Sequence, residues 1–326
     1  MKRILLLGLM IAILIGMNTG PQSQSLSVLT VERMGDRLLS SEEFSAILQA
    51  AEHLNLAVDI QYQTQLYGVA TKGHYQAIID QDGVIYYYSR DPIRLIAATD
   101  TEWLIHKTTA GHAQLISYQL ATNQEVVLAD IPGEHLGDGI VWGNDVYIES
   151  SSLQKGHLIY RYQTRTRTLG IFVENGYEPR LYRDRLHYLY EKGDQLGFES
   201  INRYGNDLQS FAPAIGDIYS YFFRGEEIDL LSVADQVDGR CFVRIENALG
   251  ESRAERFDYF DARFQSDRLI FGHNGYHDSL ILNDTLIQIP KELHFRRLMN
   301  QLVYFVYQEE HYRIPLASLE AILDSK

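Results

Sequence analysis

The feature that most constrains the fold is a short hairpin that recurs along the chain. Each copy has a strand, a tight polar turn and a second strand that begins with an apolar residue. In the segment 139–150, the turn Gly143-Asn144-Asp145 leads directly into Val146. Such turn residues between two apolar runs predict a β-hairpin. The residues that follow a turn in this way are Trp103, Val146, Leu186, Ile228, Leu269 and Leu302.

These six residues follow one another at intervals of 33 to 43 residues. A similar interval before Trp103 leads back to Ile60, in a strand-like segment without the turn. The units also have second halves, because 111–128 and 156–172 align and each contains two alternating strands around a Thr-containing turn. A four-stranded unit of about 40 residues that cannot bury its faces alone is typical of a propeller blade. We predict an all-β chain, a β-propeller of six four-stranded antiparallel blades, or seven if a first unit begins near Ile60.

Two other β architectures fit the pattern less well. A pair of β-sandwiches would also give short strands at regular spacing. The constant phase of polar turn and apolar residue favours the propeller instead. A membrane β-barrel requires regular ten-residue alternating strands, which the segments after the turns do not show.

Residues 1–25 have the order of parts of a signal peptide. Lys2 and Arg3 precede an apolar run from Ile4 to Met17, which is short for a membrane-spanning helix. Cleavage is therefore favoured over an anchor. The best cleavage site, Ser23-Gln24-Ser25, is not a regular one, so an anchor through residues 4–17 stays open. Either form predicts a secreted or cell-envelope protein outside the cytoplasm.

The remaining segments flank the repeats. Residues 26–58 predict a β-α-β leader, with a helix over 40–56 that begins with a capping box of Ser40 and Glu43. The propeller is expected over 59–316, with 311–316 as its closing strand, and a C-terminal helix and tail over 317–326.

Composition limits the partners. The net charge of −14 disfavours nucleic acid, whose binding depends on clustered Lys and Arg, and it disfavours anionic lipid. Membrane contact is expected only through an uncleaved N-terminal segment. Cys241 is the only cysteine, so no internal disulfide can form.

In its period, its polar turns before apolar strands and its aromatic strand Ile159-Tyr160-Arg161-Tyr162, the chain resembles bacterial extracytoplasmic propellers of the TolB-like and DUF5050-like kind. The resemblance covers about residues 59–316. It implies a fold and a compartment and nothing catalytic.

Weak metal candidates occur at two places. Asp80 and Asp82 precede Gly83 like part of a calcium loop, but Asp-Gly between apolar runs favours a type I′ turn. His273, His277 and Asp278 could hold zinc if their loop folded inward, although its glycines favour a solvated turn.

Two surface clusters are ambiguous. In the run Tyr86-Tyr87-Tyr88, Tyr87 should face opposite to its neighbours, and packing between sheets is favoured over a binding platform. The basic residues Arg161, Arg165 and Arg167 are expected on a solvated outer strand.

No hydrolase elbow, zinc helix or nucleotide-binding loop occurs in the sequence, so it names no catalytic residue and no cofactor. We expect a binding or scaffolding module for a protein or cell-envelope component. The alternative is a propeller enzyme, a hydrolase or lyase acting on a glycan or peptide at the channel mouth. The eleven histidines also suggest a pH-responsive protein.

Overall fold

The computed structural model describes residues 32–324, apart from positions 34, 111 and 194 and the stretches 212–216, 225–226, 238–239, 248–251, 258–260, 266–268, 274–277 and 283–284. The chain divides into two compact units, Met1–Glu32 and Arg33–Lys326. The predicted signal or anchor at 1–25 lies outside the described residues, and the ring of sheets belongs to the second unit. None of the helices in the described part of the chain combines the length and the apolar character needed to cross a membrane.

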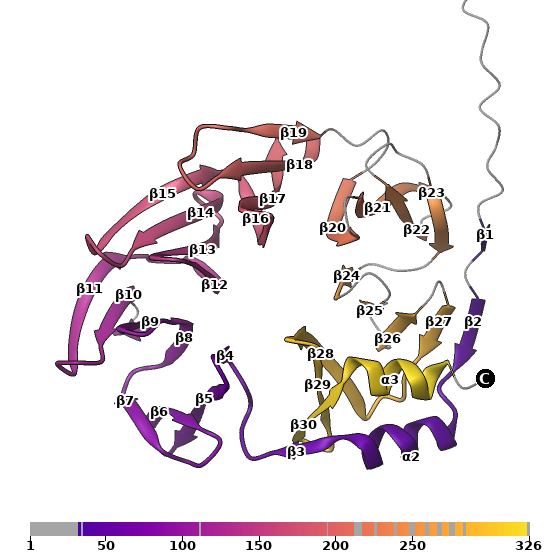
Figure 1. Ribbon diagram of the computed structural model, residues 1–326, viewed down its shortest axis with the longest axis horizontal. Coiled ribbons are helices and arrows are strands. Elements are labelled where there is room, and N and C mark those ends of the chain that lie inside the picture. Colours follow the sequence, from indigo (N-terminus) through magenta and orange to yellow (C-terminus); the bar gives the residue numbers. More distant parts are fainter. Residues whose placement is uncertain are drawn as a thin grey trace, which may run out of the picture. The chain divides into compact units, whose positions relative to one another are not determined.

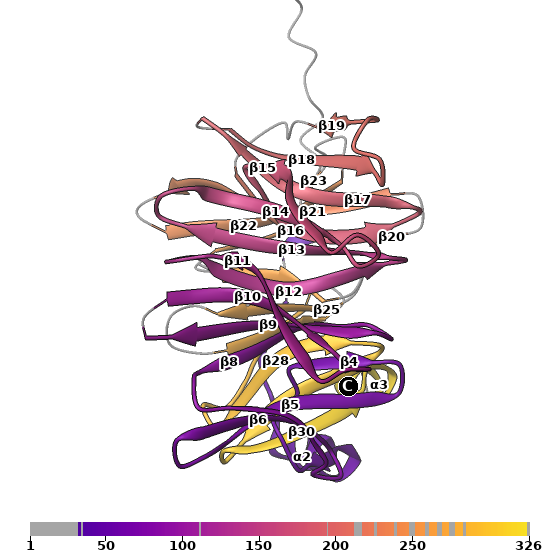
Figure 2. The same cartoon turned by 90° about the vertical axis from the view of Figure 1, so that its left-hand side faces the viewer.

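Seven sheets form a ring, and the first strand of each faces the centre (Figure 1). The predicted β-propeller is therefore confirmed, and the seventh blade that the sequence allowed is present. Six blades use four consecutive strands, whereas the last combines three strands with one from the N-terminal part. Seen from the side, neighbouring sheets stack face to face (Figure 2).

We number the blades in chain order. Blade 1 contains β4 (Ile60–Tyr62), β5 (Gln65–Lys72), β6 (Tyr75–Asp80) and β7 (Ile85–Ser89); blade 2 contains β8 (Ile93–Ala98), β9 (Glu102–Thr109), β10 (His112–Gln119) and β11 (Gln124–Asp130). Blade 3 contains β12 (His135–Trp142), β13 (Asp145–Ser152), β14 (Gly156–Gln163) and β15 (Thr168–Glu174); blade 4 contains β16 (Gly176–Tyr182), β17 (Arg185–Lys192), β18 (Gln195–Asn202) and β19 (Gln209–Phe211).

Blade 5 contains β20 (Asp217–Arg224), β21 (Glu227–Val237), β22 (Arg240–Asn247) and β23 (Ser252–Phe257); blade 6 contains β24 (Asp261–Phe264), β25 (Leu269–His273), β26 (Asp278–Leu282) and β27 (Thr285–Gln288). Blade 7 contains β28 (Leu293–Met299), β29 (Leu302–Tyr307), β30 (Glu310–Pro315) and β3 (Glu52–Leu54). The other elements are β1 (Glu32–Arg33), β2 (Gly35–Leu38), α2 (Ser41–Ala50) and α3 (Leu316–Leu323).

The six apolar residues that marked the repeat occupy equivalent places. Each lies at the start of the second strand of its blade, in β9, β13, β17, β21, β25 or β29. The residue expected for blade 1 was wrong, because Ile60 lies in the first strand and the equivalent residue is Leu66 in β5. The turn before Leu66 is Gln63-Thr64, which has none of the usual turn residues even though Gln63 adopts a positive φ of 55°. Nothing in the sequence therefore signals a turn at this point.

Blades 1 to 4 and blade 7 have buried apolar residues on both faces. In β13, Val146 and Ile148 pack in a core with Leu104 of blade 2, whereas Tyr147 between them packs with Leu186 of blade 4. Successive side chains of a strand point to opposite faces, so one apolar strand serves two interfaces. This is why the second strands read as nearly continuous apolar runs.

Strands β2 and β3 of the N-terminal part join the sheets of blades 6 and 7. β3 pairs antiparallel with β30 and so closes blade 7, whereas β2 pairs in parallel with the outer strand β27 of blade 6. Within the segment 26–58, for which a β-α-β leader is expected, β2, α2 and β3 follow one another, and these two strands lie in different blades. The expectation that 311–316 is the closing strand was wrong, since β30 is the third strand of blade 7 and β3 lies outside it.

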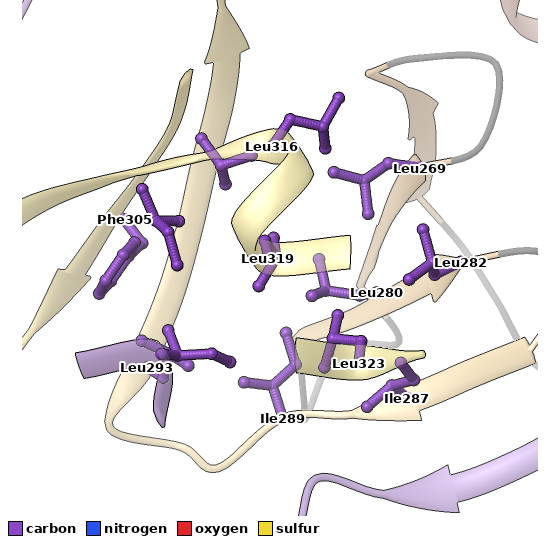
Figure 3. Packing of buried hydrophobic residues seen from close by; sticks show 13 residues of the cluster. Leu269, Leu280, Leu282, Ile287, Ile289, Leu293, Phe305, Leu316, Leu319 and Leu323 are labelled. Carbon is purple, nitrogen blue, oxygen red and sulfur yellow. The ribbon is translucent and has the colours of Figure 1, made fainter. Parts of the chain in front are cut away.

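The two helices pack near this closure. The predicted capping box is present: the Ser40 hydroxyl accepts from the Glu43 amide at 3.2 Å, and the Glu43 carboxylate accepts from the Ser40 amide at 2.8 Å. Helix α2 ends at Ala50 rather than at 56, because residues 52–54 are extended in β3. Helix α3 lies where predicted and joins a core between blades 6 and 7 (Figure 3). Its inward residues are Leu316, Leu319 and Leu323.

The seam between blades 7 and 1 is small. Leu54 of β3, Leu66 of β5 and Tyr304 of β29 form its buried centre. Polar contacts hold β3 on β30 within blade 7: His53 Nε2 lies 2.8 Å from Glu310 Oε2, and Arg313 pairs with Glu52 at 2.7 Å. Apolar burial by β3 therefore holds the first and last blades together.

We predict that Leu54→Ala destabilises the ring. Leu54 is only 3% exposed, and truncation of a buried leucine leaves a cavity, so the free energy of unfolding should fall by about 2–4 kcal/mol in urea titration. Leu153→Ala is the control, because Leu153 is fully exposed and should change stability by less than about 0.5 kcal/mol. Equal stability of both variants would mean that β3 does not close the ring.

The buried His187 of β17 makes the free energy of unfolding depend on pH. It is 7% exposed and lies between the rings of Phe198 and Phe223, with centroid distances of 5.6 and 4.4 Å. Burial lowers the pKa of His187 from 6.5 to about 4. Between pH 6.5 and pH 4 the His187 imidazole is therefore protonated in the unfolded chain and neutral in the folded chain. Stability is complete above pH 6.5 and is lost as the pH falls toward 4.

The corresponding prediction compares His187→Phe with the parent. Between pH 7.5 and pH 5 the parent should lose about 2 kcal/mol of unfolding free energy through this histidine, and the variant should lose less by that amount. His112→Gln, at an exposed position of β10, should keep the pH dependence of the parent. Identical pH profiles for parent and His187→Phe would show that His187 is not the group responsible.

Candidate functional site in the centre of the ring

The first strands carry bulges that disturb their pairing with the second strands. The register shifts between Leu95 and Ala97 in β8 and between Leu136 and Gly139 in β12, and β16, β20 and β28 shift in the same way. A bulge leaves residues unpaired and redirects their side chains. The residues left out of register are Ile96, Gly137, Asp138, Glu178, Pro179, Tyr219 and Arg296.

Asp138, from the bulge of β12, is bound by arginines of two other blades. Arg94 of blade 2 contacts its Oδ1 at 2.7 Å, and Arg297 of blade 7 contacts its Oδ2 at 3.0 Å. Blades 7 and 3 are not neighbours, since blades 1 and 2 lie between them. The Arg297–Asp138 ion pair therefore spans the centre of the ring. Its side chains remain partly open to solvent, so each pair contributes modestly to stability.

Arg297 also holds the segment that joins β3 to β4. Its Nη2 donates hydrogen bonds to the carbonyls of Val58 and Asp59. Arg94 likewise donates to the carbonyl of Leu136 in addition to Asp138. The two guanidinium groups thus connect blades 2, 3 and 7 with the closing segment.

A cavity of 390 Å³ lies beside this ion-pair group, and we call it the central pocket. The charged side chains that line it are those of Asp59, Arg94, Asp138, Arg296 and Arg297. Its remaining walls come from the seam between blades 7 and 1. They comprise Leu54, Ala57, Val58, Tyr304, Phe305, Val306, His311 and Tyr312.

The surroundings of the pocket shift the pKa values of two lining residues, Asp59 and His311. Burial raises the pKa of Asp59, and Asp138 adds to the rise, while the charges of Arg297 and Arg94 oppose it. Burial lowers the pKa of His311, and the positive charge of Arg296 lowers it further. Asp59 thus holds its proton more tightly than an exposed aspartate, and His311 is neutral at neutral pH.

Other buried acids hold the blades together. Glu102 of blade 2 accepts from Tyr162 of blade 3 at 2.8 Å, and Asp145 of blade 3 accepts from Arg203 of blade 4 at 2.8 Å. Asp145 also pairs with Arg161 at 2.8 Å. Because these carboxylates are occupied by neighbouring strands, they serve as ties between blades.

Asp80 organises a turn. Its Oδ1 accepts from the amides of Asp82 and Val84 at 3.0 and 2.9 Å, and its Oδ2 accepts from the Tyr86 hydroxyl at 3.0 Å. These hydrogen bonds lower the pKa of Asp80 although burial opposes them. Asp82 is exposed on the turn. The loop spans residues 81–84 and is therefore longer than the type I′ turn favoured from sequence.

The zinc candidates are only partly described. His273 ends β25 and is the register partner of Asp278, but its side chain and all of His277 lie outside the described residues. Asp278 accepts from His294 Nδ1 at 2.9 Å, an ion pair between blades 6 and 7 when His294 is charged. Within the described ranges, no three His, Cys, Asp or Glu residues gather closely enough to hold a metal ion.

The tyrosine run deviates from the expected alternation. The Tyr86 ring lies 5.3 Å from that of Trp103, and the Tyr87 ring lies 5.0 Å from that of Tyr118, so both pack against blade 2. The pairing of β6 with β7 skips Tyr86, and this bulge turns Tyr86 to the same side as Tyr87. Tyr88 is 72% exposed. Packing is therefore the role of the first two tyrosines.

The three arginines of the basic cluster, Arg161, Arg165 and Arg167, lie in different environments. Arg161 is mostly covered, pairs with Asp145 and lies over the Phe172 ring, so a solvated position was wrong for it. Arg167 donates to Gln119 of blade 2 at 2.6 Å, and Arg165 is exposed.

Sequence reasoning missed every charged residue of the central pocket. A usable signal does exist, because the first strands of blades 2, 3 and 7 are apolar segments that each contain a charged residue near their middle or start: Arg94, Asp138, Arg296 and Arg297. Such residues in a strand that faces the centre indicate a polar channel.

Comparison with known proteins supports the fold alone. No protein-family model matches the chain, and no curated protein matches it. Among solved structures, the Dos1 propeller is 10% identical, with a TM-score of 0.50 over 85% of this chain and 81% of that one. TolB from Acinetobacter baumannii is 15% identical, with a TM-score of 0.40 over 74% of this chain and 59% of that one. An uncharacterized protein, lmo1340 from Listeria monocytogenes EGD-e, is 10% identical, with a TM-score of 0.46 over 88% and 96% of the two chains.

We predict that Asp138→Asn loosens the ring. The change leaves Arg94 and Arg297 without their shared anion, and two partly exposed ion pairs together contribute about 1 kcal/mol to the free energy of unfolding. Asp207→Asn is the matched control, because Asp207 pairs with one arginine, Arg185, within a single blade. It should change stability by less than about 0.5 kcal/mol in the same urea titration. A smaller loss for Asp138→Asn than for the control would contradict a cross-channel tie.

Proposed function

We propose that this protein is an exported binding or scaffolding module and that a protein or cell-envelope component binds at the central pocket. Export rests on the basic start and apolar run of residues 2–17. Non-catalytic binding rests on the state of Asp138, since an arginine holds each of its carboxylate oxygens. A carboxylate engaged in this way cannot readily serve as a base or nucleophile.

The size of the pocket agrees with recognition of a small group. Ligand pockets in proteins measure about 300–1,000 Å³ and combine apolar walls with a few polar groups, and the central pocket has both features. Nucleic acid is not a suitable partner, because the chain carries a net charge of −14.

The enzyme alternative depends on one residue. Asp59 is the pocket acid whose pKa is raised by burial, the property that a general acid requires. Chemistry that uses a pair of carboxylates would need a second free acid in the pocket. Asp138 is the other acid lining it, and both of its oxygens are bound.

Site-specific photocrosslinking in cells that produce the full chain tests the proposal. A photoreactive residue at Val306, or at His311, should give the same crosslinked species, because both residues line the pocket. The same residue at Tyr204, an exposed position in blade 4, should not give it. Crosslinks from all three positions, or from none, would count against binding at the pocket.

A reporter fusion tests export separately. Alkaline phosphatase, which is active only outside the cytoplasm, should be active when fused after residue 40 and inactive when residues 1–25 are deleted from that fusion. Activity without residues 1–25 would overturn export by this segment.

A further inference from the structure

The central pocket has a positive excess within an acidic protein. Three arginines and two aspartates line it, in a chain whose net charge is −14. Two of these arginines, Arg94 and Arg297, share the Asp138 carboxylate. Together these three side chains carry one positive charge, and Arg296 and Asp59 carry one charge of each sign. Arg296 is therefore the pocket arginine that is not bound to Asp138.

Arg296 lies at a backbone bulge, and its side chain is available to bind a ligand. It is the bulged residue of β28, so its side chain leaves the regular alternation of the strand. It is exposed, and among the described residues its guanidinium has no hydrogen bond or ion pair. Its neighbour His311 is neutral at neutral pH, because burial and the charge of Arg296 both lower the pKa of His311. His311 can therefore donate or accept a hydrogen bond without adding charge.

The rest of the pocket restricts the ligand to a monoanion. A guanidinium binds one carboxylate in a planar, two-pronged geometry. The five charged side chains of the pocket sum to one positive charge, which balances a carboxylate but leaves part of the charge of a dianion such as phosphate uncompensated. One free guanidinium beside two acids suits a single negative charge.

The apolar walls of the pocket favour a ligand in which an apolar group is attached to the anion. Val58, Phe305 and Tyr312 line the pocket beside the charged groups. A volume of 390 Å³ lies at the small end of the range for ligand sites, so it suits one or two residues of a chain rather than a long polymer.

We propose that the central pocket binds an apolar carboxylate, with Arg296 as its anion-binding residue and the seam between blades 7 and 1 as the apolar wall. This chemistry occurs at the C-terminal end of a peptide with an apolar last residue and in a free aryl or alkyl carboxylic acid. The inference rests on the proposed binding function and names the ligand class of the same pocket.

Isothermal titration of the purified full chain tests the proposal with four probes. These are N-acetyl-Gly-Gly-Phe with a free carboxylate, the same peptide as its C-terminal amide, 3-phenylpropionate, and inorganic phosphate. The free carboxylate peptide should bind at least tenfold more tightly than its amide and more tightly than phosphate. Comparable affinity of 3-phenylpropionate would assign the site to free acids, and tighter binding of the peptide would assign it to chain ends.

Substitutions test whether Arg296 is the residue that binds the carboxylate. Arg296→Gln should weaken carboxylate binding about tenfold, which corresponds to about 1.4 kcal/mol, and Arg296→Lys should retain part of the affinity. The matched control is Arg90→Gln, because Arg90 is an exposed arginine of blade 1 that lies over Tyr75 away from the pocket. It should bind like the parent.

The outcomes separate the ligand class from the function. Equal affinity for acid and amide, or unchanged affinity in Arg296→Gln, overturns the carboxylate proposal. If the crosslinks from Val306 and His311 persist in that case, the binding function stands and only the ligand class is wrong. Loss of both the crosslinks and carboxylate binding overturns both.

Discussion

The structure depends on burial of both faces of every sheet. A single four-stranded sheet has two apolar faces and no stable way to cover them, so each blade requires a neighbour on each side. In this chain one strand serves two interfaces, as Val146 and Tyr147 show by packing toward blades 2 and 4. A row of such sheets has two bare ends. The ring exists because β3 lets the last blade cover the first.

The closure also creates the site. Arg297 reaches from blade 7 to Asp138 and to the segment that leads from β3 into β4. The pocket lies at the same seam, lined by that segment and by blade 7. The place where the ring is joined is therefore the place where charged side chains converge, and ring stability and pocket geometry depend on the same residues.

Periodicity predicted the repeating part of the fold, because each second strand must present an apolar residue directly after a tight turn. Trp103, Val146 and Leu186 obey this rule. The prediction failed at two places, one for a local reason and one for a long-range reason. The Gln63-Thr64 turn has unusual residues for its positive φ, and β3 is recruited to blade 7 by pairing that lies some 260 residues away along the chain.

The pocket could not be predicted in the same way. Arg94, Asp138 and Arg297 are distant in sequence and meet because three first strands face one centre. Gly137 and Gly139 mark the bulge that contains Asp138, but the sequence does not show that Arg94 and Arg297 meet it. The bulges at Ile96 and Arg296 contain neither Gly nor Asn and have no composition signal. Tyr86 shows the same limit, since one skipped residue reversed its expected face.

Hydrogen exchange of the backbone amides of β3 tests the closure most directly. The pairing of Glu52–Leu54 with β30 predicts that amides of β3 exchange slowly and gain or lose protection together with those of β28 to β30. Exchange of residues 52–54 at the rate of an unstructured peptide, while β28 to β30 stay protected, would show that the ring is not closed by this strand.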